Sequence, residues 1–331
     1  MSRLTQFGNA LYTGEKSFDF VGNRIRWYVI GGVVVLLAIA LTILRGGFSF
    51  GIEFRGGSEF RVSAPAVLSE QIALDTVAEL VGQTSNPRVS IVGGDSVRVQ
   101  TEQLTDAETT SLRTDLADAY GVPVDQVTAS FVGATWGQDI TRQALIGLAV
   151  FLVLVSIVMA FYFRTWKMSV AALVALAHDL VITAGIYGVL GFEITPAAVI
   201  GLLTILGYSL YDTVVVFDKV RENTQQDGEE SRRTFAESVN LAVNQTLVRS
   251  INTSVVAVLP VGSILFIGSL LLGAGTLRDI AIALFVGMIA GTYSSVFIAA
   301  PLYVHLRENE PEHQKQGTKV KAPRPATGAV R

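Results

Sequence analysis

The sequence predicts a membrane protein, an α-helical bundle of six transmembrane helices with an inserted ferredoxin-like α+β extracytoplasmic domain. Half of the 331 residues are apolar, only 16% are charged and the mean hydropathy is +0.48. That is too little charge to cover the surface of a soluble protein of this length. Six apolar segments are each long enough to cross a bilayer. One polar stretch carries the alternating patterns of a small soluble domain.

The first apolar segment, 27–44, follows a polar N-terminal segment, 1–26. Ala38-Ile39-Ala40 has the small-residue form of a signal-peptide cleavage site. However, the apolar run continues to Leu44, and the polar segment before it is longer than a signal peptide has. We therefore expect a first membrane helix that is not removed.

Residues 45–138 are predicted to form the inserted domain, in the β-α-β-β-α-β order of ferredoxin-like folds. Thr105 and Glu108 have the form of a capping box that opens a helix, and Gly93-Gly94-Asp95 marks a tight hairpin turn. The strands are expected at 57–64, 88–92, 96–100 and 127–132, and the helices at 69–81 and from 105 to about 120.

The remaining five membrane helices are expected between residues 139 and 304, with a loop at 218–250. Within that loop, apolar residues recur at helical spacing from Phe235 to Leu247. This spacing indicates a helix on the membrane surface or a short helix packed on the bundle. The tail, 305–331, is rich in Pro, Gly, Lys and Thr and is expected to be disordered. The five segments are 141–163, 168–190, 196–217, 251–272 and 279–304.

Positively charged residues predict the orientation of the chain in the membrane. Arginine and lysine gather in the N-terminal segment, between the second and third helices at Arg164 and Lys167, in the 218–250 loop and in the tail. The short loops on the opposite side carry almost no positive charge: the loop at 191–195 has no arginine or lysine, and the loop between the fifth and sixth helices has only Arg278 near it. The positive-inside rule then places both termini and the loop in the cytoplasm and the domain outside.

The fourth membrane segment contains a carboxylate, Asp212, with apolar residues on both sides. A charge near the centre of a membrane helix costs about 2.5–3.5 kcal/mol on insertion scales, so it is kept where it pairs or moves ions. Tyr208 and Ser209 can share its helix face and hydrogen-bond to it. Arg249 begins the fifth helix at a similar depth. A carboxylate that binds a guanidinium only when ionised is a proton-coupled switch; the alternatives are a permanent ion pair or a carboxylate at the wet interface.

A second polar pair, His178-Asp179, lies near the middle of the third helix. Neighbouring residues on a helix point about 100° apart, so the two are not expected to pair with each other. Asp179 can join a polar cluster in the bundle, and His178 can relay protons near neutral pH. Interhelical hydrogen bonding is the alternative for both. Small residues predict close helix packing without any activity: Gly185, Gly188 and Gly191 in the third helix, and Gly287 and Gly291 in the sixth.

Several kinds of site are absent from the sequence. It contains no cysteine, no Walker-type phosphate loop, no metal-spaced His or Cys cluster and no nucleophile elbow. We therefore expect no enzyme activity, no cofactor and no metal site. An ion gradient is the expected source of energy, with H⁺ or Na⁺ as the coupling ion.

Two stretches resemble the SecD/SecF family of protein-export membrane proteins. GIEFRGGSEF (51–60) is similar to its Gly-x-Asp/Glu-Phe-x-Gly-Gly signature, and GYSLYDTVVVFDKVREN (207–223) looks like the fourth-helix signature of its SecF members. Residues 177–181 and 245–254 also fit. Tyr211 stands where the family usually has Asn, and Glu53 where Asp is commoner. The motif residues are Gly51, Glu53, Phe54, Gly56, Gly57, Gly207, Tyr208, Thr213, Asp218, Arg221, Glu222 and Asn223.

The resemblance implies a multi-pass subunit of the bacterial plasma membrane with helices like those of RND exporters. Its implied partners are SecD, the SecYEG channel, unfolded exported polypeptides and, in many bacteria, YajC. The resemblance implies no nucleic-acid partner. The proton gradient would help these chains move outward after the SecA motor has acted. The family associates proton conduction with the positions of Asp212 and Arg249, and the Gly-Gly motif is expected to shape the turn out of the first helix. An RND-type small-molecule or lipid exporter and a non-conducting assembly scaffold are the alternative functions.

Overall fold

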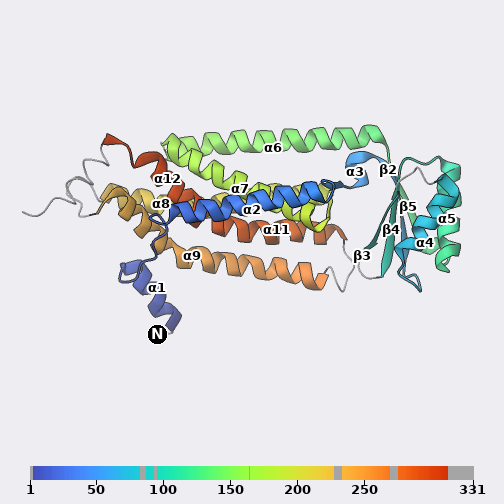
Figure 1. Ribbon diagram of the computed structural model, residues 1–331, viewed down its shortest axis with the longest axis horizontal. Helices are drawn as coiled ribbons and strands as arrows, with labels where there is room; N and C mark the ends of the chain where they lie inside the picture. The colour runs from blue at the N-terminus through green and yellow to red at the C-terminus, as the bar shows by residue number, and fades with distance from the viewer. Residues whose placement is uncertain are drawn as a thin grey trace, which may run out of the picture.

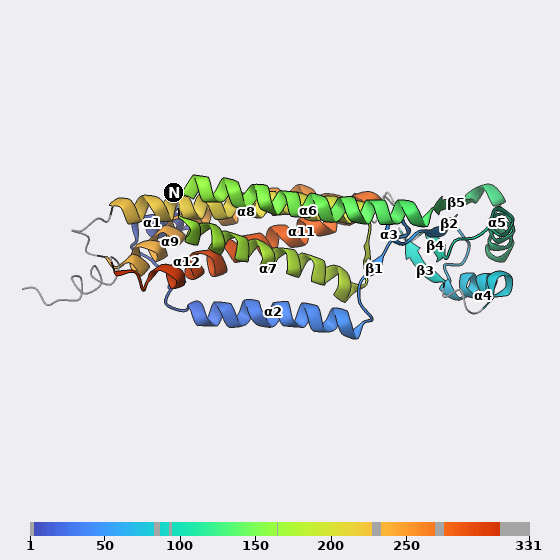
Figure 2. The same ribbon diagram turned by 90° about the horizontal axis from the view of Figure 1, so that it is seen from above.

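The computed structural model describes residues 3–82, 87–92, 95–163, 165–226, 233–268 and 275–311. The chain forms an elongated bundle of helices with a small α+β domain at one end (Figures 1 and 2). Six helices of the described residues are long and apolar enough to span a membrane, which confirms the predicted fold class. They are α2 (Arg24–Leu44), α6 (Ala134–Phe163), α7 (Trp166–Leu190), α8 (Pro196–Gln226), α9 (Phe235–Ser263) and α11 (Gly275–Ser294).

The last two spans continue through π-helical turns. Residues Ile264–Gly268 extend α9, and residues Ser295–Ala299 join α11 to α12 (Ala300–Arg307). A π turn inserts one extra residue per turn and thereby changes which side chains face inward. The second of these turns lies at the candidate site described below.

Small residues let the central helices approach each other closely, as the sequence predicted. Gly185 and Gly188 of α7 leave no room for a side chain beside Ala38 and Thr42 of α2. On the other side of the bundle, Gly291 of α11 packs against Ser209 of α8, and Gly287 packs against Ile205. A methyl group at any of these glycines would collide with the neighbouring helix, so the spacing of α2, α7, α8 and α11 depends on them.

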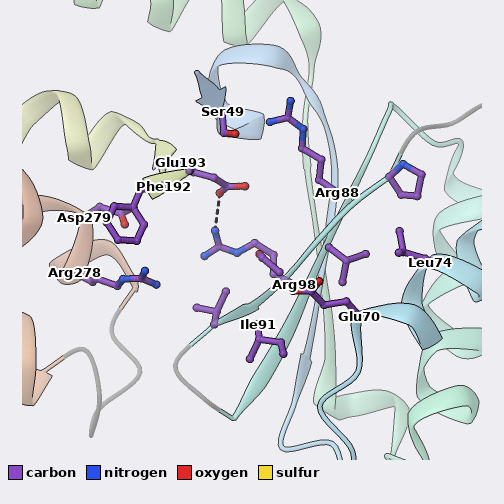
Figure 3. A pocket seen from close by; sticks show the side chains of 15 residues that line it. Ser49, Glu70, Leu74, Arg88, Ile91, Arg98, Phe192, Glu193, Arg278 and Asp279 are labelled. Atoms are coloured by element: carbon purple, nitrogen blue, oxygen red, sulfur yellow. Dashed lines mark hydrogen bonds and ion pairs between the residues drawn. The ribbon is translucent and has the colours of Figure 1, made fainter. Parts of the chain in front are cut away.

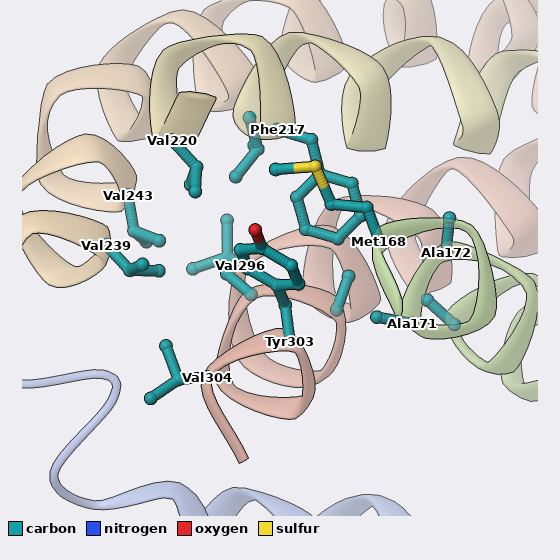
Figure 4. Close-up of a cluster of buried hydrophobic side chains, with 14 of the residues drawn as sticks. Met168, Ala171, Ala172, Phe217, Val220, Val239, Val243, Val296, Tyr303 and Val304 are labelled. Carbon is teal, nitrogen blue, oxygen red and sulfur yellow. The ribbon is translucent and has the colours of Figure 1, made fainter. Parts of the chain in front are cut away.

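The apolar core of the bundle (Figure 4) lies where α12 meets α8 and α9, at the end remote from the α+β domain (Figures 1 and 2). Tyr303 of α12 and Phe217 of α8 are fully buried there, with ring centroids 5.7 Å apart. Met168, Val239 and Val243 join them from α7 and α9. These side chains exclude water around the helix ends and hold α7, α8, α9 and α12 together.

Of the two alternatives for the helix within the 218–250 loop, packing on the bundle is confirmed and a position on the membrane surface is wrong, but the helix is not a short separate one. Residue 235 begins α9, capped by Thr234 and Glu237, and the helix runs without a break into the fifth membrane span. The stretch from Phe235 to Leu247 contains no Gly or Pro to interrupt it, and Phe235, Val239 and Val243 are buried in the core. At the other side, α8 extends to Gln226. Residues 227–232 are outside the described residues.

The N-terminal segment is folded onto α9. Helix α1 (Arg3–Thr13) buries Leu11 completely. After it, the backbone N–H of Phe18 donates to Asn244 Oδ1 at 2.8 Å and that of Phe20 donates to Asn240 Oδ1 at 2.9 Å. The two asparagines are one turn apart on α9 and so present both amides to the same extended chain. At the other terminus, residues 312–331 of the predicted disordered tail are outside the described residues.

The α+β domain has the predicted ferredoxin-like order. Its sheet is antiparallel, with the strands in the spatial order β3-β4-β2-β5, and Phe60, Val99 and Leu112 are fully buried between sheet and helices. Thr105 and Glu108 form the predicted capping box, and the hairpin residues Gly93 and Gly94 are outside the described residues. The elements are β2 (Gly57–Ser63), α4 (Glu70–Val81), β3 (Arg88–Val92), β4 (Ser96–Thr101), α5 (Asp106–Tyr120), a 3-10 turn at Val124–Gln126 and β5 (Val127–Val132).

A second, very small sheet joins the domain to the bundle. Strand β1 (Ser49–Phe50) pairs in parallel with β6 (Glu193–Ile194), which lies between α7 and α8. A helical turn, α3 (Ile52–Arg55), follows β1 and packs on α6. Two-residue strands carry no periodic signal, so the sequence did not predict this connection.

Candidate functional site

Two buried carboxylates lie near the middle of the bundle. Asp179 of α7 is 1% exposed and Asp212 of α8 is 6% exposed. Serine and threonine hydroxyls from α8, α9 and α11 surround them, and the two acids differ in how completely those hydroxyls satisfy them. Because an unsatisfied buried charge is far more costly than a satisfied one, this difference decides what each acid can do.

Asp179 has partners on both oxygens. Its Oδ2 accepts hydrogen bonds from Ser209 Oγ at 2.5 Å and Ser294 Oγ at 2.7 Å. Its Oδ1 lies 3.1 Å from His178 Nδ1. The expectation that His178 and Asp179 do not pair was wrong, because rotation about the side-chain bonds brings the imidazole over the carboxylate although the two Cα–Cβ bonds diverge. The predicted polar cluster around Asp179 is confirmed.

His178 faces the outer helix α2. Its Nε2 is buried without a hydrogen-bond partner among the described residues, and a Cβ on Gly31 of α2 would lie 3.6 Å from that atom. The ring of Tyr293 is on its other side, with centroids 5.9 Å apart. One imidazole nitrogen is therefore held by Asp179, and the other is directed toward α2.

Asp212 is only half satisfied. Its Oδ1 accepts a hydrogen bond from Ser250 Oγ of α9 at 2.7 Å. Its Oδ2 is buried and accepts no hydrogen bond of normal length and angle from the described residues, although the Ser295 hydroxyl lies near the carboxylate. The predicted bonds from Tyr208 and Ser209 are not formed, because Ser209 faces Asp179 and the Tyr208 hydroxyl donates to Ser254 Oγ at 3.4 Å.

The expected ion pair between Asp212 and Arg249 is not formed either. Arg249 is exposed, and its Nη2 donates to the hydroxyl of Tyr211 at 3.3 Å. Ser250, the next residue of α9, occupies the inward position beside Asp212, and neighbouring residues on a helix point about 100° apart. The two contacts are therefore adjacent: Asp212 with Ser250 inside the bundle, and Tyr211 with Arg249 at its surface. The predicted similarity in depth of Asp212 and Arg249 is confirmed.

Further hydroxyl residues complete the cluster; Thr213 was named only as a motif residue, and Thr292, Ser294 and Ser295 were missed by the sequence reasoning. Thr213 Oγ1 and Ser295 Oγ are 2.9 Å apart, and Ser254 Oγ and Thr292 Oγ1 are 2.5 Å apart. Ser294 and Ser295 both point inward, to Asp179 of α7 and Thr213 of α8 respectively, where the π turn begins. Two adjacent serines in an apolar helix are the signal that identifies this position.

The glycine motif is distant from the carboxylates and joins the domain to the bundle. Gly46 and Gly47, with φ of +96° and +94°, make the turn out of α2, so the motif does not shape that turn as expected. Gly51 precedes α3, which contains Glu53 and Phe54, and Gly56 and Gly57 follow it. Gly57 has φ +135° and lies against the carbonyl of Thr101, where no side chain fits. Burial raises the pKa of the Glu53 carboxyl.

The charged end of the second motif also has structural contacts. Asp218 accepts a hydrogen bond from the Tyr162 hydroxyl at 2.7 Å, and Arg221 Nη1 lies 3.5 Å from the Tyr162 carbonyl. Glu222 pairs with Lys219, and Asn223 Nδ2 donates to Gln245 Oε1 at 2.9 Å. These residues connect the end of α8 to α6 and α9. The structure places Gly207 on an exposed face of α8 with nothing near it. No group of metal-ligating residues occurs in the part of the chain that the structure describes.

Comparisons with known proteins agree on one family. A family model described as "Protein export membrane protein SecD/SecF, C-terminal" matches residues 113–309. The chain is 45% identical to the protein translocase subunit SecF of Streptomyces coelicolor over all of its own length and 87% of that protein. It is 46% identical to SecF of Mycobacterium tuberculosis H37Rv, covering 91% of this chain and 70% of that one.

A longer relative and a solved structure extend the comparison. The protein translocase subunit SecDF of Thermus thermophilus is 33% identical over 303 residues, which are 88% of this chain and 38% of that protein. The crystal structure of SecDF from the same organism, described as a translocon-associated membrane protein, superimposes with a TM-score of 0.79 at 30% identity. That match covers 88% of this chain and 39% of the solved chain.

Proposed function

The chain belongs to the SecD/SecF family, and on that premise we propose that it is a SecF-type auxiliary subunit of the Sec protein translocase. It uses the proton gradient to promote the export of polypeptides. The observation that supports proton coupling most directly is Asp212 Oδ2, a buried carboxylate oxygen without a hydrogen-bond partner in the described residues. An ionised carboxylate in this position is energetically unfavourable because its charge is buried and one oxygen is unpaired, and protonation removes that charge.

The neighbouring contacts supply the two states of the switch. When Asp212 is protonated it has no charge to attract Arg249, and the guanidinium stays on Tyr211 as in this structure. When Asp212 is ionised it attracts Arg249, which is one residue from Ser250 on α9. A cycle of protonation therefore moves α9 against α8. Asp179 and His178 continue the polar cluster toward α2, and imidazole takes up and releases protons near neutral pH.

We propose the orientation and partners on other grounds. Basic residues of α1, of the end of α8 and of α12 lie at the bundle end remote from the α+β domain (Figure 1), which favours that end in the cytoplasm and the domain outside. The Thermus thermophilus relative is one chain named SecDF, of which this chain matches 38%. SecD is therefore the proposed partner that supplies the remainder. The SecYEG channel, SecA and YajC follow as proposed partners from the family alone.

The experiment is Asp212→Asn in cells, compared with Asp139→Asn on the exposed surface of α6. Asparagine keeps an acceptor for Ser250 and cannot ionise. We expect proton flux in vesicles and the export rate to fall at least about a hundredfold, the low end of what loss of a proton-transferring group produces. Protein level and association with SecD should be unchanged, and Asp139→Asn should behave as the parent chain does.

Four other outcomes would contradict parts of the proposal. Normal export in Asp212→Asn would remove the proton role from Asp212. Loss of the protein itself would favour a scaffold in which Asp212 is structural. Flux that follows sodium at constant pH would make Na⁺ the coupling ion. Normal export together with increased retention of small molecules or lipids would favour an RND-type exporter.

A further inference from the structure

Strand β3 is at one edge of the domain sheet and has an open backbone edge. The backbone N–H of Ala64 donates to the carbonyl of Asp95, and these two residues continue the register in which β2 pairs with β4. Because hydrogen-bonded pairs alternate along an antiparallel ladder, the odd-numbered residues of β4 direct their backbone N–H and C=O groups to β2. The even-numbered residues of β4 therefore direct their backbone groups to β3. Their partners on β3 are also even-numbered; Ser90, for example, is opposite Arg98. The N–H and C=O groups of Val89 and Ile91 consequently point away from the sheet. No other described segment pairs with β3.

This open edge faces a cleft between the domain and the bundle (Figure 3). The cleft has a volume of about 470 Å³ and is lined by all five residues of β3 and by Leu74 of α4. Phe192, Glu193 and Arg278 line its opposite wall, at the ends of α7 and α11. Ile91 is 41% exposed beside it. A strand of five residues spans about 17 Å, and because all five residues of β3 line the cleft, the cleft follows the whole of this edge.

The other edge of the same sheet is different. In β5, Val127 is one of the residues whose backbone N–H and C=O groups point away from the sheet. Its carbonyl accepts a hydrogen bond from Arg113 Nε of α5 at 2.7 Å. The Arg113 Nη2 also donates to Val124 O at 3.0 Å. No β5 residue lines the cleft. A side chain therefore covers part of the β5 edge, whereas none of the described residues covers the β3 edge.

The charges along the cleft are mixed. Arg98 Nη1 binds Glu193 Oε2 at 2.8 Å, and the Arg278 guanidinium lies 5.0 Å from the centroid of the Phe192 ring. Arg88, Glu70 and Asp279 add both signs. Such a cleft does not select a ligand by net charge, while the exposed backbone groups of β3 recognise any extended chain. Recognition through main-chain hydrogen bonds suits a ligand whose sequence varies.

We propose that this cleft binds an exported polypeptide in an extended conformation, as an added strand on β3. The proposal rests on the proposed function, because export supplies the unfolded chain as the occupant. Val89 and Ile91 provide two N–H donors and two C=O acceptors to the added strand. An unpaired edge of this kind is a template for pairing with another chain.

The first test places a photo-crosslinking amino acid at Ile91, in the full chain with its partner in membranes. The control position is Phe131 on the β5 edge, which is also exposed. An export substrate stalled during translocation is the probe. We expect adducts with the substrate at position 91 and none above background at position 131. Equal adducts at both positions, or none at position 91, would overturn the proposal.

The second test separates the backbone from the side chain. Ile91→Pro removes an N–H that points outward and leaves every β3–β4 hydrogen bond in place, as edge strands permit. Ile91→Thr keeps the N–H and is the matched control. With the crosslinker at Ser90, which also lines the cleft, we expect the Pro variant to lose about fivefold in adducts relative to Thr, the effect of one backbone hydrogen bond. Equal yields would show that backbone pairing is not used.

Failure of this proposal is distinguishable from failure of the proposed function. If Asp212→Asn abolishes export while position 91 yields no adduct, the chain is a proton-coupled subunit that does not bind its substrate here. If position 91 yields adducts while Asp212→Asn exports normally, the cleft binds the polypeptide and the proton role is wrong. Thermal unfolding of the Pro and Thr variants confirms that both are folded before either result is used.

Discussion

Asp179 and Asp212 show how two similar residues in one bundle acquire different roles from their surroundings. Asp179 contacts two serine hydroxyls and an imidazole, so its charge is compensated and its position is held. Asp212 has one serine partner and one oxygen without any in the described residues. We interpret Asp179 as the structural centre of the polar cluster and Asp212 as the residue that changes state.

This interpretation predicts that Asp179→Ala is strongly destabilising. Ser209, Ser294 and His178 would lose their shared partner inside the bundle, and each unsatisfied buried group costs roughly 1–3 kcal/mol. We expect the free energy of unfolding in detergent to fall by roughly 3 kcal/mol, measured by denaturant titration. Asp139→Ala on the exposed face of α6 is the control and should change it by less than about 0.5 kcal/mol. A similarly small effect of Asp179→Ala would contradict the structural role.

At the scale of elements, backbone contacts between helices determine which side chains meet. Glycines of α7 set the distance to α2, and Gly291 of α11 sets the distance to α8 beside Ser209. At the start of the π turn Ser295–Ala299, Ser294 contacts α7 and Ser295 contacts α8. Helix spacing and helix phase together assemble the cluster from four helices.

Gly188→Ala tests the spacing between α2 and α7. Alanine favours helix by about 1 kcal/mol over glycine, but its methyl group at this position would collide with the Thr42 side chain. We expect a net loss of roughly 1–3 kcal/mol, as overpacked cores show. Gly147→Ala in α6, where nothing lies within 4 Å, is the matched control and should be neutral or slightly stabilising. The free energy of unfolding of both variants is measured in detergent. Equal changes would show that α2 can move away from α7 without loss of stability.

At the scale of the whole molecule, a few contacts hold the domain against the bundle. Strand β1 pairs with β6, and Arg98 and Gln100 of β4 bind Glu193 at 2.8 and 3.3 Å. From the same connection, Thr195 Oγ1 donates to Asp279 Oδ2 of α11 at 2.8 Å. The loop between α7 and α8 therefore contacts both the sheet and α11.

Glu193→Gln should loosen this connection. The substitution removes the charge that Arg98 binds while about four-fifths of both side chains are buried, which costs roughly 2 kcal/mol for a charge-assisted hydrogen bond. We expect a broader distribution of distances between spin labels on α5 and α6, measured by pulsed electron paramagnetic resonance. Glu222→Gln, in a pair whose glutamate is 50% exposed, is the control and should leave the distribution unchanged. An unchanged distribution in Glu193→Gln would show that the charge of Glu193 is not needed to hold the domain against the bundle.

The sequence by itself determined the elements of this fold. Apolar run length identifies the membrane helices, and alternation with capping and turn residues identifies the α+β domain, because these signals are local and depend on nearest neighbours. It also identified Asp179, Asp212 and the small residues that pack helices. It failed for the 218–250 loop, where periodicity showed a helix but not that α9 continues through it.

Only the tertiary structure decided which side chains meet. The sequence shows that Ser209, Asp212, Arg249 and Ser250 are near the same depth, but not how each helix is rotated about its own axis. A rotation by one residue exchanges Arg249 for Ser250 beside Asp212. That rotation is set by contacts with residues far away in the chain, such as Ser254 with Thr292 of α11 and Asn244 with the backbone of Phe18. The partners of Asp212 are consequently a property of the assembled bundle and not of its own helix.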